Sequence, residues 1–200
     1  MTDCVTIVDY QLGNVKSVSN AFEYLGASVV ITNSPSVVKS ADYLVVPGVG
    51  AFGVGIENLK EKGLDEAILS FAGSGRPLLG ICLGFQMFCA SSEEFGTHVG
   101  LGLFESAITR FPKTVRVPHV GWAPLESDQS KSDIFGLLPY YFIHSYCAMN
   151  ALNANSLYWA DYLGVNFVAA CFKDNVVGVQ FHPEKSGIQG LNFLQKFLKN

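Results

Sequence analysis

Short apolar runs alternate with helical stretches along the first half of the chain, and this alternation constrains the fold more than any other feature. The runs are rich in Val, Ile and Leu, as strands buried on both faces are. They occupy residues 4–10 (CVTIVDY), 28–32 (SVVIT), 43–46 (YLVV) and 77–81 (PLLGI). Strands that alternate with helices in this way predict a parallel sheet covered by helices on both faces.

The segments between these runs carry helical signals. After Asn14, apolar residues recur at three- and four-residue intervals up to Leu25, and Gly26 stands where a glycine ends a helix. One or two helices are predicted between Val54 and Phe71, and another from Phe85 to Ala90. The first half therefore has a βαβαβ rhythm.

The second half of the chain predicts antiparallel strands and one closing helix. Strand-like segments with little helix between them lie at residues 107–111, 140–146, 156–159, 168–173 and 176–181. Between the last two, Asp174 and Asn175 predict a two-residue type I′ turn, in which both residues have positive φ. Residues 187–198 place apolar side chains on one helical face. We predict one α/β domain over residues 1–200, with a largely parallel central sheet flanked by helices and antiparallel strands in its C-terminal half.

The charged residues and cysteines exclude several classes of function. The chain has 13 Lys and Arg against 17 Asp and Glu, a net charge of −4, without a basic run that would attract nucleic acid or an anionic membrane. It shows no signal peptide and no apolar stretch of the roughly 20 residues that span a bilayer. Five cysteines without a CxxC pair favour reduced thiols over disulfides or zinc. We therefore expect a cytoplasmic protein without a metal site.

Residues 80–84 (GICLG) have the pattern of a nucleophile elbow. They follow an apolar strand and precede a helix, and glycines on both sides of Cys82 permit a sharp turn. At a helix N-terminus the helix dipole favours the thiolate form, and the N–H of Leu83 points toward a developing oxyanion. A buried structural cysteine is the ordinary alternative. The agreement of five consecutive residues with both flanking elements favours a nucleophile.

Among the four histidines, His182 has the best setting for a catalytic base. In residues 180–184 (QFHPE), Pro183 favours extended geometry at His182, so that His182 and Glu184 can project to the same side. A carboxylate beside an imidazole fixes its tautomer and stabilises the imidazolium. A solvated pair is the alternative for this motif alone. Together with Cys82, the motif predicts a Cys–His–Glu triad.

Residues 48–53 (GVGAFG) match the dinucleotide fingerprint G-x-G-x-x-G in letters only. The fingerprint opens the first βαβ unit, and an acidic residue ends the next strand, whereas this segment follows the third strand. We interpret it as backbone that approaches the reacting centre and supplies N–H groups for an oxyanion. Glu93 and Glu94, at an expected helix end, need no role beyond solvation.

Four motifs resemble those of the class I, triad-type glutamine amidotransferases. They are PGVGAF at 47–52, GICLGFQ at 80–86, YFIHSY at 141–146 and GVQFHPEKSG at 178–187. The chain is most similar to the glutaminase subunits of imidazole glycerol phosphate synthases, from DYQLGN at 9–14 to the last helix. The resemblance implies a flavodoxin-like fold and hydrolysis of glutamine to glutamate and ammonia through a thioester on Cys82. It implies no cofactor.

The resemblance also implies roles for individual residues. It makes Cys82 the nucleophile, His182 the base and Glu184 its orienting carboxylate. Gly50 and Leu83 match the donors of oxyanion N–H groups. The positions that hold glutamine correspond to Gln86, Ser145 and Tyr146. The positions that face a partner correspond to Asn14, His119, Trp122, Tyr141 and Lys185.

The implied partner is a (β/α)₈ barrel cyclase, which forms a heterodimer with the glutaminase. It uses the ammonia to make imidazole glycerol phosphate and AICAR in histidine biosynthesis. Val120 and Ala123 depart from the family's usual segment near that partner. The sequence leaves three alternatives open: a paralogue that feeds a sugar amidotransferase of surface polysaccharide synthesis, a stand-alone thiol hydrolase on another γ-glutamyl substrate, and a non-catalytic module.

Overall fold

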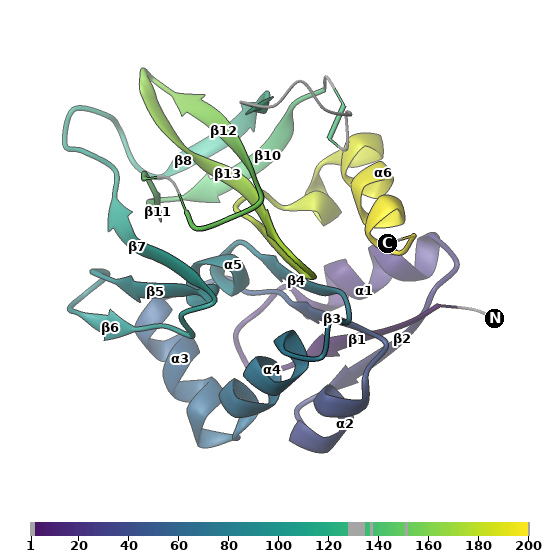
Figure 1. The fold of residues 1–200 in the computed structure, drawn as a ribbon. Coiled ribbons are helices and arrows are strands. Elements are labelled where there is room, and N and C mark those ends of the chain that lie inside the picture. Colours follow the sequence, from purple (N-terminus) through teal and green to yellow (C-terminus); the bar gives the residue numbers. More distant parts are fainter. Residues whose placement is uncertain (1–2, 128–134, 137, 151, 200) are drawn as a thin grey trace.

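The protein is built around an eight-stranded sheet, seen in a computed structural model that describes residues 3–127, 135–136, 138–150 and 152–199 (Figure 1). The strand order is β2 (Ser28–Thr32), β1 (Cys4–Val8), β3 (Tyr43–Val46), β4 (Leu78–Ile81), β14 (Val176–Val179), β13 (Val165–Lys173), β12 (Ser156–Tyr162) and β9 (Glu126–Ser127). The first five strands pair in parallel, and their order is that of flavodoxin-like sheets. The remaining three pair antiparallel.

Helices cover both faces of the parallel part. One face carries α1 (Val15–Tyr24) and α6 (Gly187–Phe197), and the other carries α2 (Pro35–Ser40), α3 (Phe52–Glu61), α4 (Leu64–Ala72) and α5 (Leu83–Phe88). Successive side chains of β1 point to opposite faces, so Ile7 packs with the cluster under α1 and α6, and Val8 packs with the other. Within the described residues, none of the helices has the length and apolar character that crossing a membrane requires.

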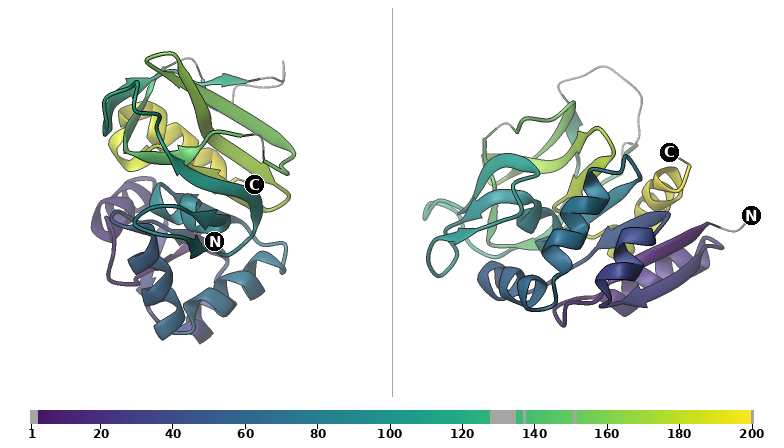
Figure 2. Two further views of the ribbon diagram at one scale, coloured as in Figure 1. Left: turned by 90° about the vertical axis from the view of Figure 1, so that its left-hand side faces the viewer. Right: turned by 60° about the horizontal axis from the view of Figure 1, so that its bottom comes forward.

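Two smaller sheets complete the fold. In the left view of Figure 2, the green strands of the C-terminal half stand apart from the purple-to-blue N-terminal elements. One of the two smaller sheets pairs β10 (Tyr140–His144) antiparallel with β8 (His119–Ala123). The other has the order β11 (Tyr146–Ala148), β7 (Phe104–Arg110), β5 (Cys89–Ser92) and β6 (His98–Val99). The predicted strand segments 107–111 and 140–146 correspond to β7, β10 and β11, and β7 pairs antiparallel with β11 as predicted. The sequence does not predict β5, β6 and β8, and β5 pairs parallel with β7.

The predicted strands and helices of the first half are confirmed with three differences: the first strand ends at Val8 and not at Tyr10, the sequence does not predict α2, and one helix ends earlier than expected. β2 and β3 have the expected bounds, and Gly26 follows α1 with a φ of +87°. The helix expected to reach Ala90 ends at Phe88, because the backbone of Cys89 already pairs with Phe104 of β7.

The hairpin between β13 and β14 has the predicted length but a different turn. Lys173 pairs with Val176, which leaves two residues in the loop. Asp174 has a φ of +53°, but Asn175 does not have the positive φ of a type I′ turn. The Asn175 side chain instead donates hydrogen bonds to the carbonyl oxygens of Ala72 and Arg76, at 3.0 and 2.7 Å. These long-range contacts of the Asn175 side chain favour the observed turn over the type I′ turn.

The predicted reactive segments meet at the carboxyl ends of four neighbouring parallel strands. Asn14 follows β1, the loop at residues 47–51 follows β3, Cys82 follows β4, and His182 follows β14. This edge is where ligands bind in open α/β sheets.

Candidate active site

Cys82 occupies the turn between β4 and α5. Its φ of 52° and ψ of −105° lie in a region that residues with a side chain rarely adopt, as expected for a strained elbow. Its N–H donates to the carbonyl oxygen of Val179, with an N···O distance of 2.8 Å. The neighbouring strand β14 therefore fixes the turn that presents the thiol.

The two glycines around Cys82 are required because backbone and aromatic atoms approach them closely. A Cβ added at Gly84 would overlap the carbonyl oxygen of Val46. A Cβ added at Gly80 would lie 2.6 Å from the ring of Phe88. Small residues at both positions allow the strand and helix to pass β3 and each other, as the elbow pattern predicts.

The imidazole of His182 lies against the carboxylate of Glu184. His182 Nδ1 is 2.8 Å from Glu184 Oε1, and both side chains are at most 1% exposed. The expected extended backbone is present at His182 only, since Pro183–Lys185 form a 3₁₀ turn, η1, that brings Glu184 back to the ring. Asn14 Nδ2 donates to the same Oε1 atom at 2.8 Å. The carboxylate is thus held from two sides.

The charges around His182 favour its protonated form. Burial alone would lower the pKa of the imidazole, but the negative charge of Cys82 and the hydrogen bonding of the ring to Cys82 and Glu184 outweigh burial and raise the pKa to about 10. Glu184 engages Nδ1, so Nε2 is the ring nitrogen on the side of Cys82. An imidazolium whose Nε2–H faces a thiolate is a proton donor ready for a leaving group.

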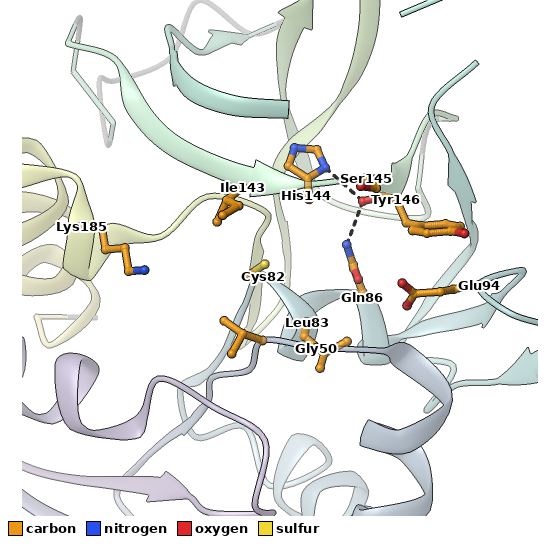
Figure 3. Close-up of a pocket in the computed structure, with 11 residues that line it drawn as sticks. Gly50, Cys82, Leu83, Gln86, Glu94, Ile143, His144, Ser145, Tyr146 and Lys185 are labelled. Atoms are coloured by element: carbon orange, nitrogen blue, oxygen red, sulfur yellow. Dashed lines mark hydrogen bonds between the residues drawn. The ribbon is translucent and has the colours of Figure 1, made fainter. Parts of the chain in front are cut away.

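A cavity of about 300 Å³ opens beside Cys82 (Figure 3). In this view Cys82 lies between Lys185 on one side and Glu94 and Tyr146 on the other. The residues that line the cavity are Val49, Gly50, Cys82, Leu83, Gln86, Glu94, Ile143, His144, Ser145, Tyr146 and Lys185. The structure therefore gathers all the residues that sequence reasoning assigned to substrate binding and to the oxyanion around one thiol.

The backbone carbonyl group of Tyr146 holds two side chains that line this cavity. The carbonyl oxygen of Tyr146 accepts a 2.8 Å hydrogen bond from Gln86 Nε2, and His144 Nδ1 lies 3.0 Å from it. Burial, with a smaller effect of His119, lowers the pKa of His144 to about 3. His144 is therefore neutral, and its Nδ1 carries the hydrogen that it donates.

The two expected oxyanion donors differ in availability. The N–H of Leu83 donates to the carbonyl oxygen of Gly48 at 3.3 Å, so it is engaged within the protein. The N–H of Gly50 makes no hydrogen bond within the described ranges. A Cβ on Gly48 would overlap the hydroxyl of Tyr10, which itself donates to Pro47 O at 2.7 Å. In this position of the loop, the N–H of Leu83, one of the two expected oxyanion donors, is not available to a substrate.

The five residues expected to face a partner do not share one environment. Trp122 is 55% exposed and makes an edge contact with half-buried Tyr141, with ring centroids 5.6 Å apart, and Lys185 is exposed. Asn14 points to Glu184. The expectation does not hold for His119, which is 3% exposed because its ring stacks on Tyr162, with ring centroids 4.1 Å apart. Burial lowers its pKa to about 4.

Glu94 is a site residue that sequence reasoning missed. It lines the cavity, and its Oε2 accepts a 2.8 Å hydrogen bond from the N–H of Phe52. Glu93 Oε1 accepts a 2.9 Å hydrogen bond from the N–H of Arg110. The prediction that both carboxylates are merely solvated is therefore wrong. They follow strand β5 and not a helix, and no local pattern separates Glu94, which reaches the cavity, from Glu93.

The part of the chain that the structure describes has no group of three or more His, Cys, Asp or Glu side chains arranged to hold a metal ion. The chemistry that its geometry supports is attack by the Cys82 thiolate on a carbonyl carbon, with proton transfer through His182.

Comparisons with known proteins agree with this site. Residues 6–200 match the family model described as glutamine amidotransferase class-I. A relative from Sulfurimonas denitrificans, named imidazole glycerol phosphate synthase subunit HisH, is 43% identical over 98% of this chain and 97% of its own. A relative of the same name from Symbiobacterium thermophilum is 41% identical over 95% of this chain and 91% of its own.

Solved structures share the fold. The chain superposes on the structure of PurLQS from Thermotoga maritima with a TM-score of 0.79 and 19% identity, over 100% of this chain and 99% of the other. A crystal structure of a glutamine amidotransferase gives a TM-score of 0.78 and 18% identity, over 97% of both chains. At such identities the likeness concerns the fold alone. The family match over nearly the whole chain, together with relatives at over 40% identity, shows that this protein belongs to the class-I glutamine amidotransferases.

Proposed function

We propose that this protein hydrolyses L-glutamine at Cys82 and delivers the ammonia to the cyclase subunit of an imidazole glycerol phosphate synthase, in histidine biosynthesis. The observation that carries the proposal is the strained Cys82 elbow beside the buried His182–Glu184 pair, at the edge of a cavity in a chain of this family. The names of the relatives support the pathway, and one family match over residues 6–200 supports a single domain.

In the first half of the reaction, the Cys82 thiolate attacks the side-chain amide carbon of glutamine and forms a C–S bond. His182 donates its Nε2 proton to the amide nitrogen, the C–N bond breaks, and ammonia leaves a γ-glutamyl thioester. In the second half, neutral His182 takes a proton from water, whose oxygen attacks the thioester carbon. The C–S bond breaks, which restores the thiolate and leaves His182 as the imidazolium. The γ-carboxylic acid product leaves and releases its proton to solvent as glutamate.

Glu184 and the oxyanion donors serve these steps without covalent chemistry. The carboxylate of Glu184 holds the Nδ1 hydrogen of His182, so that Nε2 faces the reacting atoms. The N–H groups of Gly50 and Leu83 receive the oxyanion. Because Leu83 N–H is bonded to Gly48 in this structure, the loop that carries Gly48 must move before both donors can act.

The cavity suits the amino-acid end of glutamine. Its volume of about 300 Å³ is at the small end of ligand pockets. We assign the α-ammonium group to the carboxylate of Glu94, because it supplies negative charge at the cavity wall opposite Lys185. Gln86, Ser145 and Tyr146 supply the neutral polar contacts.

An exposed apolar face next to the cavity supports a partner subunit. The pairing of β10 with β8 sets Tyr141 beside Trp122 and Ile143 beside Val120, on the face opposite the buried side chains. Val120 is 53% exposed and Trp122 is 55% exposed. Exposed apolar patches of this kind mark interaction sites. We assign this face, with Lys185, to a (β/α)₈ barrel cyclase.

The experiment that tests this function uses Cys82→Ala in the reconstituted complex with the cyclase. We expect glutamine-dependent formation of imidazole glycerol phosphate to be abolished, while added ammonium salts still support it. Wild-type protein and Cys4→Ala, which removes a thiol distant from the site, serve as controls. Glutamine-dependent product from Cys82→Ala would refute the assignment of the nucleophile. Turnover of another γ-glutamyl substrate without response to the cyclase would refute the assignment of the partner.

A further inference from the structure

Gln180 is a buried polar residue next to the nucleophile. It follows directly after β14, is 0% exposed, and its N–H donates to the carbonyl oxygen of Ala169 at 2.8 Å. Its side-chain Nε2 lies 3.6 Å from Cys82 Sγ, at hydrogen-bond distance for sulfur. The Gln180 amide takes no part in the proposed steps of glutamine hydrolysis.

A chain of hydrogen bonds determines which end of the Gln180 amide faces the sulfur. The carbonyl oxygen of Tyr146 can only accept, so Gln86 must turn its NH₂ group toward it. The same NH₂ group donates to Gln180 Oε1 at 3.0 Å. Gln180 therefore presents its oxygen to Gln86 and its N–H to Cys82.

The reverse orientation of the Gln180 amide is unfavourable at both ends. It would set the NH₂ of Gln180 against the NH₂ of Gln86, and it would set an oxygen against the Cys82 sulfur. A buried donor without a partner costs free energy, and an oxygen beside a thiolate repels it. The orientation is thus fixed before any substrate enters.

We infer that Gln180 is a positioning residue whose side-chain N–H, aimed by Gln86, stabilises the thiolate of Cys82 from the side of β14. His182 supplies the positive charge near the sulfur, and Gln180 supplies a neutral donor. The effect of Gln180 on turnover rests on the proposed function, because it assumes that Cys82 attacks glutamine. The contact between Gln180 and Cys82 does not depend on the substrate.

Two substitutions remove this donor in different ways. Gln180→Met keeps the length of the side chain and has no N–H. Gln180→Asn keeps an amide but withdraws it by about one C–C bond, roughly 1.5 Å. Gln189→Met is the matched control, because Gln189 is also a buried glutamine, lies on α6, and does not line the cavity.

The measurement is the rate of alkylation of Cys82 by iodoacetamide as a function of pH, with the Cys82 peptide quantified by mass spectrometry on the full chain. Hydrogen bonds to charged groups are strong enough that losing one shifts a titration by about one pH unit. We expect the midpoint to rise by about one unit in Gln180→Met and Gln180→Asn and to stay unchanged in Gln189→Met. Glutamine turnover with the cyclase should fall at neutral pH and recover at higher pH.

A merely structural role for Gln180 predicts a different result. If both Gln180 variants keep the wild-type midpoint, or if Gln189→Met shifts it equally, the inference is overturned. Circular dichroism identifies a variant that does not fold, and the other Gln180 variant then carries the test. Alkylation needs no glutamine, so a protein that failed as a glutaminase would still report whether Gln180 acts on the Cys82 sulfur.

Discussion

Replacing Asn14 with alanine tests where this residue acts. Resemblance to the family places Asn14 at a partner surface, whereas the structure has its Nδ2 atom 2.8 Å from Glu184 Oε1. Glu184 has a fully buried side chain, and its other oxygen, Oε2, has no partner within the described residues. Asn14→Ala would leave the carboxylate with His182 as its single hydrogen-bond donor.

The size of the effect follows from these contacts. A hydrogen bond to a charged group contributes about 1.5–3 kcal/mol to stability. For a domain of this length, 1 kcal/mol corresponds to about 2–4 °C in melting temperature. We therefore expect Asn14→Ala to melt about 3–12 °C below the wild type. Asn20 is an exposed asparagine within α1, the helix that Asn14 precedes, so Asn20→Ala is the matched control and should melt within a degree or two of the wild type.

Asn14→Asp sharpens the test because it puts a second carboxylate beside Glu184. Two like charges at about 4 Å repel by about 4 kcal/mol at the effective dielectric constant of a protein surface. One carboxyl therefore has a raised pKa in the folded state, and the associated stability is present at low pH and lost as pH rises. We expect Asn14→Asp to melt below Asn14→Ala at pH 8, and the difference to shrink at pH 5.

The assay is thermal unfolding of the isolated chain, without the cyclase. A residue that acts only at a partner surface leaves this melting temperature unchanged and weakens the complex instead. A wild-type melting temperature for Asn14→Ala, together with weaker binding to the cyclase, would therefore refute the reasoning from the Asn14–Glu184 contact.

Two further predictions concern charge at the site. The pKa of His182 is raised from 6.5 to about 10, so the stability that its protonation contributes is complete below about pH 6.5 and is lost as pH rises toward 10. Cys82→Ala lacks the negative charge that raises this pKa. Between pH 6 and 10, the melting temperature should therefore fall more steeply for the wild type than for Cys82→Ala. Equal slopes would contradict the assignment of Cys82 as a cause of the raised pKa of His182. Glu94→Gln keeps an oxygen for the N–H of Phe52 but removes the charge, so we expect the KM for glutamine to rise about tenfold or more, with a smaller change in kcat. An unchanged KM in steady-state assays would show that Glu94 does not hold the ammonium group.

The features that could be predicted from the sequence depend on neighbouring residues. The elbow at Cys82 needs a strand, two glycines and a helix within one short segment. The contact of His182 with Glu184 needs two residues on either side of a proline. The strands β2 and β3 show as unbroken apolar runs. In each case the pattern and the physical cause occupy the same stretch of chain.

The features that could not be predicted depend on residues far apart in the sequence. Asn14 and Glu184 are 170 residues apart, and nothing near Asn14 indicates that its amide meets a carboxylate. Glu94 differs from Glu93 because its carboxylate meets the N–H of Phe52, the first residue of α3 and 42 residues away in the sequence. The ring of His119 is buried by Tyr162, which lies on another strand. Local periodicity contains no information about such contacts.

The place of β14 in the sheet has a consequence for how the protein is made. This strand lies between β4 and β13, yet it is among the last elements to be synthesised. Gln180 and Cys82 are 98 residues apart, so at about 5–20 residues per second a ribosome finishes the elbow roughly 5–20 s before it delivers the residues that complete the site. During that interval β4 has an unpaired edge, and the thiol has no base. The nascent chain is therefore catalytically silent and most prone to aggregation until its final segment emerges.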